Sequence, residues 1–342
     1  MIELFKPKRI FFEQGALEYP IGERLFSLFK NKNIPVSMLK SHNRVTGIPG
    51  KNPREAYLEG KKTMVVGVRK SLDFATCKPS AHFQLPLVTS CMGKCQYCYL
   101  NTQLGKKPYI RLYVNIEEIL GKAKELIEER KPEVTVFEGA ATSDPIPVEP
   151  YTGALQQVIQ FFAQEPLGRF RFVTKFTDVD SLLTSTHEKH TTVRFSINSQ
   201  PIISTFEQGT PRLEARIDAA KKVYSAGYPL GFIVAPVFLY KNWQTDYHTM
   251  LEKLSQALDN TDDNPPRFEV ISHRYTLRAK STILEVFPDT KIPMKEEDRQ
   301  FKYGQFGYGK YLYPKEKRKQ VIDFFTTEIN NLFPNAAIDY II

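Results

Sequence analysis

The feature that most constrains the fold is the alternation of apolar strands and amphipathic helices between residues 84 and 275. Residues 116–130 carry apolar side chains at helical spacing, whereas residues 230–237 form an almost continuous apolar run. Six such strands alternate with helices, which predicts βαβ units and a parallel sheet that is covered on both faces. A curved partial (βα)6 barrel and an open doubly wound sheet both fit this pattern. The glycine-rich dinucleotide fingerprint is absent after the first strand, which disfavours a nucleotide-binding fold.

The expected elements divide the chain into three parts that form one compact unit. Residues 1–80 are expected to be a basic, irregular region packed on the barrel, residues 81–275 the α/β partial barrel, and residues 276–342 a hairpin followed by a closing helix. Strands are expected at 9–12, 63–68, 85–88, 134–137, 171–174, 192–197, 230–237 and 267–271, with an edge strand at 337–342. Helices are expected at 21–29, 116–130, 151–162, 180–187, 212–225, 246–258 and 316–332, and a glycine- and aromatic-rich hairpin or loop at 302–311.

Composition restricts the function classes. Of the 342 residues, 42% are hydrophobic and 25% are charged, which is ordinary for a globular protein and excludes a disordered chain or a collagen-like fibre. No run of 18 apolar residues occurs and the first residues do not form a signal peptide, so we expect no membrane partner and a cytoplasmic location. The net charge of +9 is concentrated in residues 30–70 and 273–319. This segregation is a candidate polyanion-binding footprint, and two solvated surface regions are the alternative.

Three of the four cysteines lie within eight residues. Cys91, Cys95 and Cys98 have the spacing C-x3-C-x2-C, and thiolates this close together can converge on zinc or on an iron–sulfur cluster. A structural zinc site needs four ligands, so the zinc alternative requires Cys77 or a histidine as well. Three ligands instead favour a cluster with one open coordination position, and Cys77 is then interpreted as structural.

This spacing, with Tyr97 just before the last cysteine, resembles the radical S-adenosylmethionine superfamily. The resemblance implies a partial barrel in which the three cysteines bind a [4Fe–4S] cluster in the loop after the first barrel strand. It also implies that S-adenosylmethionine occupies the open iron, and that its reductive cleavage yields a 5′-deoxyadenosyl radical that abstracts hydrogen.

Residues 83–102, residues 137–145 and the opening segment 7–13 are similar to the spore photoproduct lyase family, and the similarity covers the whole chain. The resemblance implies direct reversal of the lesion 5-thyminyl-5,6-dihydrothymine to two thymines in the DNA of germinating spores. It further implies lesion-containing double-stranded DNA as the substrate, an electron donor such as flavodoxin or ferredoxin, and a location in the spore core.

The resemblance also assigns roles in catalysis. Tyr97 and Tyr99 match two tyrosines thought to help regenerate the adenosyl radical. Ala141 stands where the family has a cysteine that returns a hydrogen atom to the thymine radical. A methyl group has no weak S–H bond, so we expect impaired thymine formation. The chain is either an engineered Cys-to-Ala variant, which the matching flanks favour, or a natural relative with another quenching route.

The ends of barrel strands are expected to hold S-adenosylmethionine. The candidate residues, several of them supported by the resemblance, are Ser143, Asp144, Lys175, Ser196, Asn198 and Ala235. A helix cap is the alternative for Asp144, and a surface charge is the alternative for Lys175.

Extraction of a linked thymine pair requires phosphate contacts and a wedge in the duplex. The candidate DNA-binding residues are Arg274, Tyr275, Tyr303, Tyr308 and Lys310. Core packing is the alternative for the tyrosines. Two other functions stay open at this point: a radical S-adenosylmethionine enzyme that acts on RNA, a peptide or a small molecule, and a zinc-stabilised nucleic-acid-binding protein.

Overall fold

The computed structural model describes residues 5–40, 45–78, 80–258, 264–303 and 309–342. The chain forms two compact units: Met1–Met92 with Leu104–Thr192, and Gly93–Gln103 with Val193–Ile342. The boundary between the two units thus falls between Met92 and Gly93, inside the cysteine-rich loop, and again between Thr192 and Val193, inside the strand Thr191–Ile197. The three-part division expected from the sequence stays a prediction.

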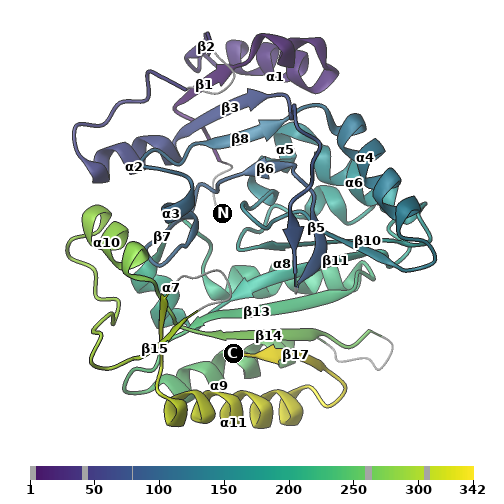
Figure 1. Cartoon of the computed structure of the whole chain (residues 1–342). Coiled ribbons are helices and arrows are strands. Elements are labelled where there is room, and N and C mark those ends of the chain that lie inside the picture. The colour runs from purple at the N-terminus through teal and green to yellow at the C-terminus, as the bar shows by residue number, and fades with distance from the viewer. Residues whose placement is uncertain (1–4, 41–44, 79, 259–263, 304–308) are drawn as a thin grey trace. The chain divides into compact units, whose positions relative to one another are not determined.

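One sheet of the first unit is built from the N-terminal region. Its strands are ordered β2 (Val36–Met38), β1 (Arg9–Phe12), β3 (Thr63–Gly67), β8 (Ile110–Tyr113) and β6 (Val88–Thr89). The first four are parallel, and β6 runs antiparallel to β8. Figure 1 shows β3 and β8 side by side. The strands expected at 9–12 and 63–68 are confirmed as β1 and β3. The expectation that the region is otherwise irregular is wrong, because Phe11, Ile48 and Val65 form a small core of their own.

Two helices accompany this sheet, α1 (Pro20–Asn31) and α2 (Pro53–Lys61). Sequence reasoning missed α2, although its start carries a standard signal: Asn52 accepts a hydrogen bond from the backbone N–H of Glu55 at 2.9 Å.

The remaining strands of the first unit are ordered β10 (Gly168–Thr174), β9 (Thr135–Glu138), β5 (Ala81–Gln84) and β4 (Thr76–Cys77). Strands β10, β9 and β5 are parallel, and β4 is antiparallel to β5. The strand expected at 85–88 is wrong in position, because Pro86 has no N–H to continue the ladder beyond Leu85. The rings of Phe137, Phe162 and Phe170 pack together against this sheet.

The helices of the first unit correct two expectations. The helix expected at 151–162 is two helices, α5 (Glu149–Thr152) and α6 (Ala154–Ala163), because Gly153 between them has a left-handed φ of 64°. The helix expected at 180–187 is only a single 3-10 turn over Asp180–Leu182, followed by residues with low helix propensity. Helix α4 (Ile116–Glu129) forms as expected.

The second unit contains a parallel sheet ordered β17 (Ala337–Ile341), β14 (Arg267–Ser272), β13 (Leu230–Val237) and β11 (Thr191–Ile197). All three pairings are parallel, which confirms these four predicted strands. Its helices are α7 (Gln200–Phe206), α8 (Leu213–Ser225), α9 (Trp243–Ala257), α10 (Leu277–Val286) and α11 (Lys315–Leu332). Figure 1 shows α9 and α11 side by side along β14 and β17. Helix α10 was not expected from the sequence; its cap is Thr276, which accepts from the N–H of Ala279.

The predicted hairpin is confirmed as β15 (Gln300–Tyr303) paired antiparallel with β16 (Gly309–Leu312). Tyr308 lies outside the described residues. Backbone hydrogen bonds between Tyr275 and Tyr311 attach β16 to the segment that follows β14. None of the helices in the described part of the chain is long and apolar enough to cross a membrane.

Candidate active site

The cysteine-rich loop begins in a fixed conformation in the first unit. Ser90 is fully buried and has a left-handed φ of 69°. Its hydroxyl donates to the carbonyl of Pro108 at 3.0 Å, and its N–H donates to the carbonyl of Thr142 at 2.8 Å. The next residue, half-buried Cys91, accepts a 2.7 Å hydrogen bond at its carbonyl from the buried ammonium of Lys61. The first cysteine is thereby held beside the loop that follows β9.

That loop carries Ala141 and Ser143. Ser143 forms a parallel bridge with Ser90 and is buried. Gly139 opens the loop with its Cα against the ring of Phe170, where a Cβ atom would come within 2.6 Å of ring carbons. A side chain at this position would push the loop away from β10, so glycine sets the path that brings Ala141 and Ser143 beside the first cysteine.

Asp144 ends the same loop as a buried acid. One carboxylate oxygen accepts from the hydroxyl of Thr174 at 2.8 Å, and the other from the N–H of Lys175 at 2.9 Å. Burial raises the pKa of Asp144 to about 6, although these hydrogen bonds oppose the shift. The carboxylate therefore joins the ends of β9 and β10, and Lys175 lies at that junction as the sequence predicted.

The second half of the loop belongs to the second unit. Strand β7 (Lys94–Cys95) pairs antiparallel with β12 (Glu207–Gln208), and helix α3 (Leu100–Gln103) follows. Cys98 donates its N–H to the carbonyl of Cys95 at 3.3 Å, which forms a turn. Tyr99 is 56% exposed. The turn and the strand pairing fix the backbone that carries these two cysteines.

Tyr97 points in the opposite direction, into the core of the second unit. Its ring packs on Phe238, and its hydroxyl donates to the carboxylate of Glu207. Burial, together with Glu207, raises the pKa of Tyr97 well above its usual value, so the phenol stays protonated. Glu207 is itself paired with Arg216 at 2.6 Å, and both side chains are completely buried.

Arg216 connects this tyrosine to the end of strand β11. Its guanidinium donates to the carbonyl of Ser196 at 3.0 Å, to the hydroxyl of Thr210 at 2.9 Å and to the carbonyl of Pro211 at 3.0 Å. All of its polar atoms thus have partners, as a buried charge requires. The network Tyr97–Glu207–Arg216–Ser196 was not expected from the sequence.

Two more of the predicted cofactor residues lie in the second unit. Asn198 is fully buried: its amide donates to the carbonyl of Pro236 at 2.9 Å and accepts from the hydroxyl of Tyr247 at 2.7 Å. The side chain therefore ties the end of β11 to β13. Ala235 is half-buried within β13.

The thiol groups fit an iron–sulfur cluster by their chemistry. All four cysteines of the chain are outside disulfides, and three are soft ligands in one short loop. Among the described residues, no three His, Cys, Asp or Glu side chains are already gathered as metal ligands. Cys91 belongs to one unit, and Cys95 and Cys98 belong to the other.

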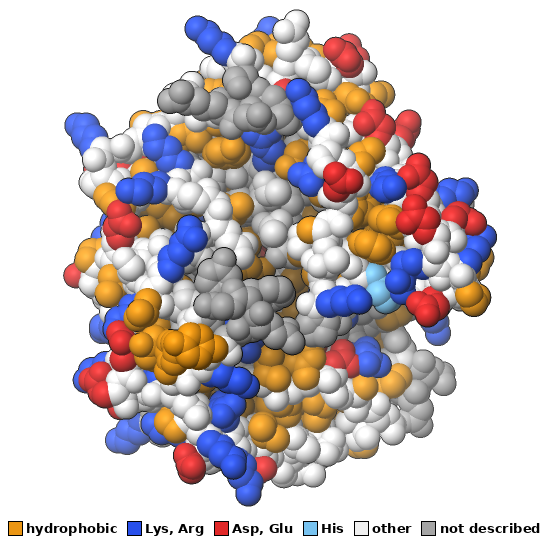
Figure 2. All heavy atoms as spheres, in the orientation of Figure 1, with side chains coloured by type: hydrophobic (Ala, Val, Ile, Leu, Met, Phe, Trp, Pro, Cys, Tyr) orange, Lys and Arg blue, Asp and Glu red, His pale blue; other side chains and the backbone are white. Residues whose placement is uncertain are grey.

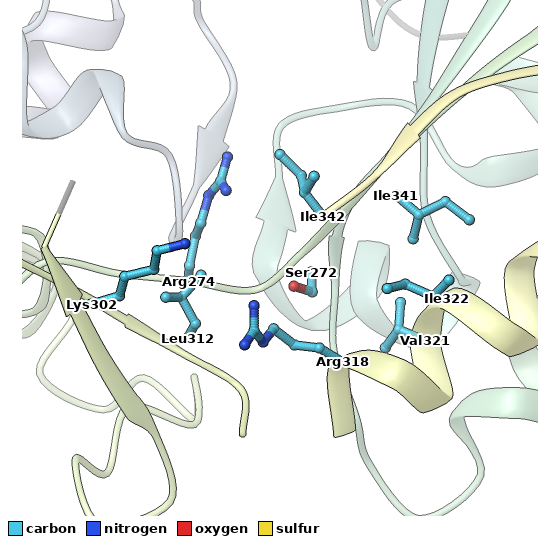
Figure 3. A pocket seen from close by; sticks show the side chains of 9 residues that line it. All are labelled: Ser272, Arg274, Lys302, Leu312, Arg318, Val321, Ile322, Ile341 and Ile342. Carbon is cyan, nitrogen blue, oxygen red and sulfur yellow. The ribbon is translucent and has the colours of Figure 1, made fainter. Parts of the chain in front are cut away.

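A basic cavity lies at the end of β14, in the second unit. It has a volume of about 280 Å³ and is lined by Ser272, Arg274, Lys302, Leu312, Arg318, Val321, Ile322, Ile341 and Ile342. Figure 3 shows Arg274 and Lys302 on one side, Arg318 next to Ser272, and isoleucine side chains closing the other side. Within the described residues, neither Arg274 nor Lys302 forms an ion pair.

Two polar atoms of this cavity are buried without a hydrogen-bond partner in the described part of the chain. They are the hydroxyl of Ser272, a residue 1% exposed, and the Nε atom of Arg318. Burial also lowers the pKa of Arg274, because its charge is poorly solvated. An anion in the cavity would satisfy these groups.

The neighbouring hairpin presents aromatic side chains to solvent. Tyr303 is 75% exposed and Phe301 is 45% exposed, and Lys310 on the paired strand is exposed as well. Figure 2 shows hydrophobic side chains next to Lys and Arg side chains over this hairpin, at the lower left. Tyr275 differs, because it is only 4% exposed and its ring stacks on Tyr311 at 5.3 Å.

Several site residues were missed by sequence reasoning: Lys61, Ser90, Glu207, Arg216, Ser272, Lys302 and Arg318. Some of them carried a signal. Arg216 falls on the apolar stripe of its helix with Leu213 and Ile217, and a charge on a buried face needs a buried partner. Lys61, Lys302 and Arg318 lie in the two basic stretches, 30–70 and 273–319. The remaining three gave none, since nothing local shows which residues meet across the fold.

Comparison with known proteins gives a uniform result. A sequence model described as "Spore photoproduct lyase" matches residues 5–342. Spore photoproduct lyase from Clostridium acetobutylicum is 51% identical, and that from Bacillus subtilis 46% identical, each over 98% of both chains. A solved spore photoproduct lyase with bound AdoMet and dinucleoside spore photoproduct has a TM-score of 0.96 at 44% identity, over 99% of this chain and 100% of the other. That protein is a double mutant, cysteine to alanine and serine to cysteine.

The fold and the three-cysteine loop define a radical S-adenosylmethionine lyase, and the match to the solved structures confirms the predicted α/β partial-barrel class. Because the family model spans nearly the whole chain, the two other functions, a radical enzyme with a different substrate and a zinc-stabilised nucleic-acid-binding protein, can be set aside. The chain belongs to the spore photoproduct lyase family.

Proposed function

We propose that this protein is a DNA repair enzyme that reverses the spore photoproduct to two thymines. The observation that carries the proposal is the whole-chain match to spore photoproduct lyases, including solved structures that contain the dinucleoside spore photoproduct. The bridge between Ser90 and Ser143 and the hydrogen bonds of Asp144 support the proposal, because they fix the backbone beside Cys91 and Ala141.

Cys91, Cys95 and Cys98 would ligate the [4Fe–4S] cluster, and S-adenosylmethionine would bind at the strand ends marked by Ser143, Lys175, Ser196 and Ala235. Together these groups supply the hydrogen-abstracting radical chemistry of the class. Asp144 and Asn198, which the sequence also suggested as cofactor residues, already have hydrogen-bond partners within the protein. Because their hydrogen bonds hold the strand ends in place, we propose that these two side chains position the site. The ligand would then contact backbone N–H and carbonyl groups at the strand ends.

Tyr97 serves as a protonated phenol. The carboxylate of Glu207 accepts its hydrogen bond, and burial keeps the hydroxyl from ionising. A phenol held in this way can give and take a hydrogen atom at one fixed position, which is the relay role that the family resemblance assigns to it. Tyr99 is exposed in this structure, and its proposed part in the relay rests on the family resemblance.

The DNA backbone is the partner that fits the basic cavity and its hairpin. Arg274, Lys302 and Arg318 bring three cations to one place, and the hydroxyl of Ser272 adds a donor, which suits a phosphate group. The exposed rings of Phe301 and Tyr303 can enter the distorted duplex as a wedge. We propose that lesion-containing double-stranded DNA binds at this cavity and hairpin. We further propose that a small redox protein, such as flavodoxin or ferredoxin, donates the electron and that the enzyme acts in the spore.

The test is an anaerobic assay with reconstituted protein, S-adenosylmethionine, dithionite and the dinucleoside lesion. We expect consumption of the lesion and formation of 5′-deoxyadenosine, with iron and not zinc bound to the protein. Unchanged lesion in the presence of a fully loaded cluster would refute the proposed function. A Cys98→Ala variant, which lacks one cluster ligand, is the matched negative control.

A further inference from the structure

Lys61 is a buried cation at the entrance to the cysteine loop. It is the last residue of helix α2 and is only 1% exposed. Its ammonium donates to the carbonyl of Cys91 at 2.7 Å and lies 5.4 Å from the centre of the Tyr57 ring. We propose that Lys61 supplies the positive charge that offsets the negative charge of the iron–sulfur cluster and so eases its reduction. The inference rests on the proposed function for the cluster that Cys91 would ligate.

The protein itself gives this cation no counter-ion. A charged ammonium that leaves water is costly unless an opposite charge lies close to it. In the described part of the chain, no carboxylate forms an ion pair with Lys61. Glu59, two residues earlier in the same helix, is paired with Arg9 and with Lys62 instead. The C-terminus of the helix adds only about half a negative charge. Most of the charge of Lys61 is therefore left for a ligand to offset.

The backbone around Lys61 fixes where its charge lies. Gly60 packs against the main chain of residues 107–108, where a Cβ atom would come within 2.8 Å of backbone atoms. The same segment accepts a hydrogen bond from the hydroxyl of Ser90 at 3.0 Å. Because glycine precedes the lysine, the end of α2 can approach the cysteine loop closely, and Lys61 reaches Cys91 from there.

An iron–sulfur cluster has the charge that this position lacks. Three thiolates outweigh the positive charge of the oxidised iron–sulfur core, and an added electron makes the site more negative still. The reduction potential of such a cluster depends on the net charge of the site and its surroundings. A fixed ammonium at a ligating residue favours the more negative, reduced state. Lys61 is thus a positioning residue that acts through Cys91 and keeps its proton while one electron arrives from the reductant.

The experiment compares the unchanged protein with Lys61→Gln, Lys61→Met and Lys62→Met, each reconstituted anaerobically with iron and sulfide. Glutamine offers an N–H donor to the carbonyl of Cys91 but has no charge, and methionine has neither. Lys62→Met is the matched control, because it removes a half-buried lysine that is already paired with Glu59 at 3.6 Å. The readout is the midpoint potential of the cluster in a dithionite titration followed by electron paramagnetic resonance.

We expect both Lys61 variants to lower the ratio of reduced to oxidised cluster at a fixed potential by about tenfold, which is a shift of about 59 mV. Lys62→Met should stay close to the unchanged protein. Equal potentials in all four proteins would overturn the inference. A shift in Lys61→Met alone would also overturn it, because the hydrogen bond and not the charge would then be what matters.

Thermal unfolding of the same proteins, with and without the cluster, gives a readout that is independent of the potential. The apoprotein shows directly whether a variant folds. Loading the cluster should raise the unfolding temperature of the unchanged protein more than that of Lys61→Met, because only the former gains a counter-ion. Equal increases would contradict the inference and leave the proposed function intact. Failure of the unchanged protein to bind iron would instead refute the proposed function.

Discussion

The two units of the protein hold their buried acids in different ways. In the first unit, Asp144 accepts hydrogen bonds from a hydroxyl and from backbone N–H groups, and burial raises its pKa to about 6. In the second unit, Glu207 is paired directly with the buried guanidinium of Arg216. The difference teaches that the first acid can change its charge near neutral pH, whereas the second depends on a counter-charge that must stay in place.

The largest effect should come from removing that counter-charge. Arg216→Met leaves Glu207 as a buried charge without its partner, so we expect the free energy of unfolding to fall by about 3–5 kcal/mol. Urea denaturation followed by circular dichroism measures the change.

Lys253→Met is the matched control for Arg216→Met. Lys253 of α9 pairs with Glu214 of α8, the helix that also carries Arg216, but both side chains are about half exposed, and such pairs contribute roughly 0–1 kcal/mol. Equal losses of unfolding free energy in the two variants would show that the buried pair contributes no more to stability than the exposed pair.

The second prediction concerns the pH dependence of stability. An acid whose pKa is higher in the folded state than in the unfolded state binds its proton more tightly when folded. Its contribution to stability is therefore lost as the pH rises from about 4 to about 6. Relative to Asp144→Asn, the unchanged protein should lose about 3 kcal/mol of unfolding free energy across this range. Parallel urea titrations of the two proteins measure it, and identical pH profiles would contradict the assignment.

The third prediction tests how the tyrosine joins the ion pair. Tyr97→Phe removes one hydrogen bond to a charged carboxylate but leaves Glu207 and Arg216 paired, so we expect a smaller loss of about 2 kcal/mol. Tyr99→Phe is the control, because its ring is exposed and the loss should stay below about 0.5 kcal/mol. Each variant loses one hydroxyl oxygen, and the two positions are two residues apart.

The smallest effect on stability is expected where a cation lacks an anionic partner. Arg274→Met should change the unfolding free energy by less than about 1 kcal/mol, because no ion pair of the described structure is broken. The same change should weaken binding to duplex DNA and reduce the slope of log affinity against log salt by about 1. An unaltered salt slope would exclude Arg274 from the DNA contact.

The sequence predicted the parts of the molecule whose signals are local. Apolar strands such as β13 and β14, the amphipathic helix α4 and the hairpin near residue 302 were found from periodicity and turn residues. The cysteine spacing likewise indicated the radical S-adenosylmethionine class, which the family match confirms. Two strands of the N-terminal sheet, β1 and β3, were also expected, but their pairing into one sheet with β8 was missed because it joins residues about 46 to 54 positions apart.

The site was predicted less completely for the same reason. Asp144 was predicted as a cofactor residue, but its hydrogen-bond partners Thr174 and Lys175 lie at the end of another strand, so these hydrogen bonds were not apparent from the sequence. The partners of Tyr97 are more than 100 residues away in the sequence. A pattern along the chain shows which residue types are present; only the fold shows which of them meet.

Ser90 has a consequence for how the holoprotein is assembled. Its left-handed backbone and its two hydrogen bonds order the entrance to the cysteine loop in the polypeptide alone. A loop that is already ordered loses less conformational entropy when its ligand arrives. A cluster that Cys91 would help to hold would therefore meet a backbone that is already shaped at this residue, and less entropy would be lost when it binds.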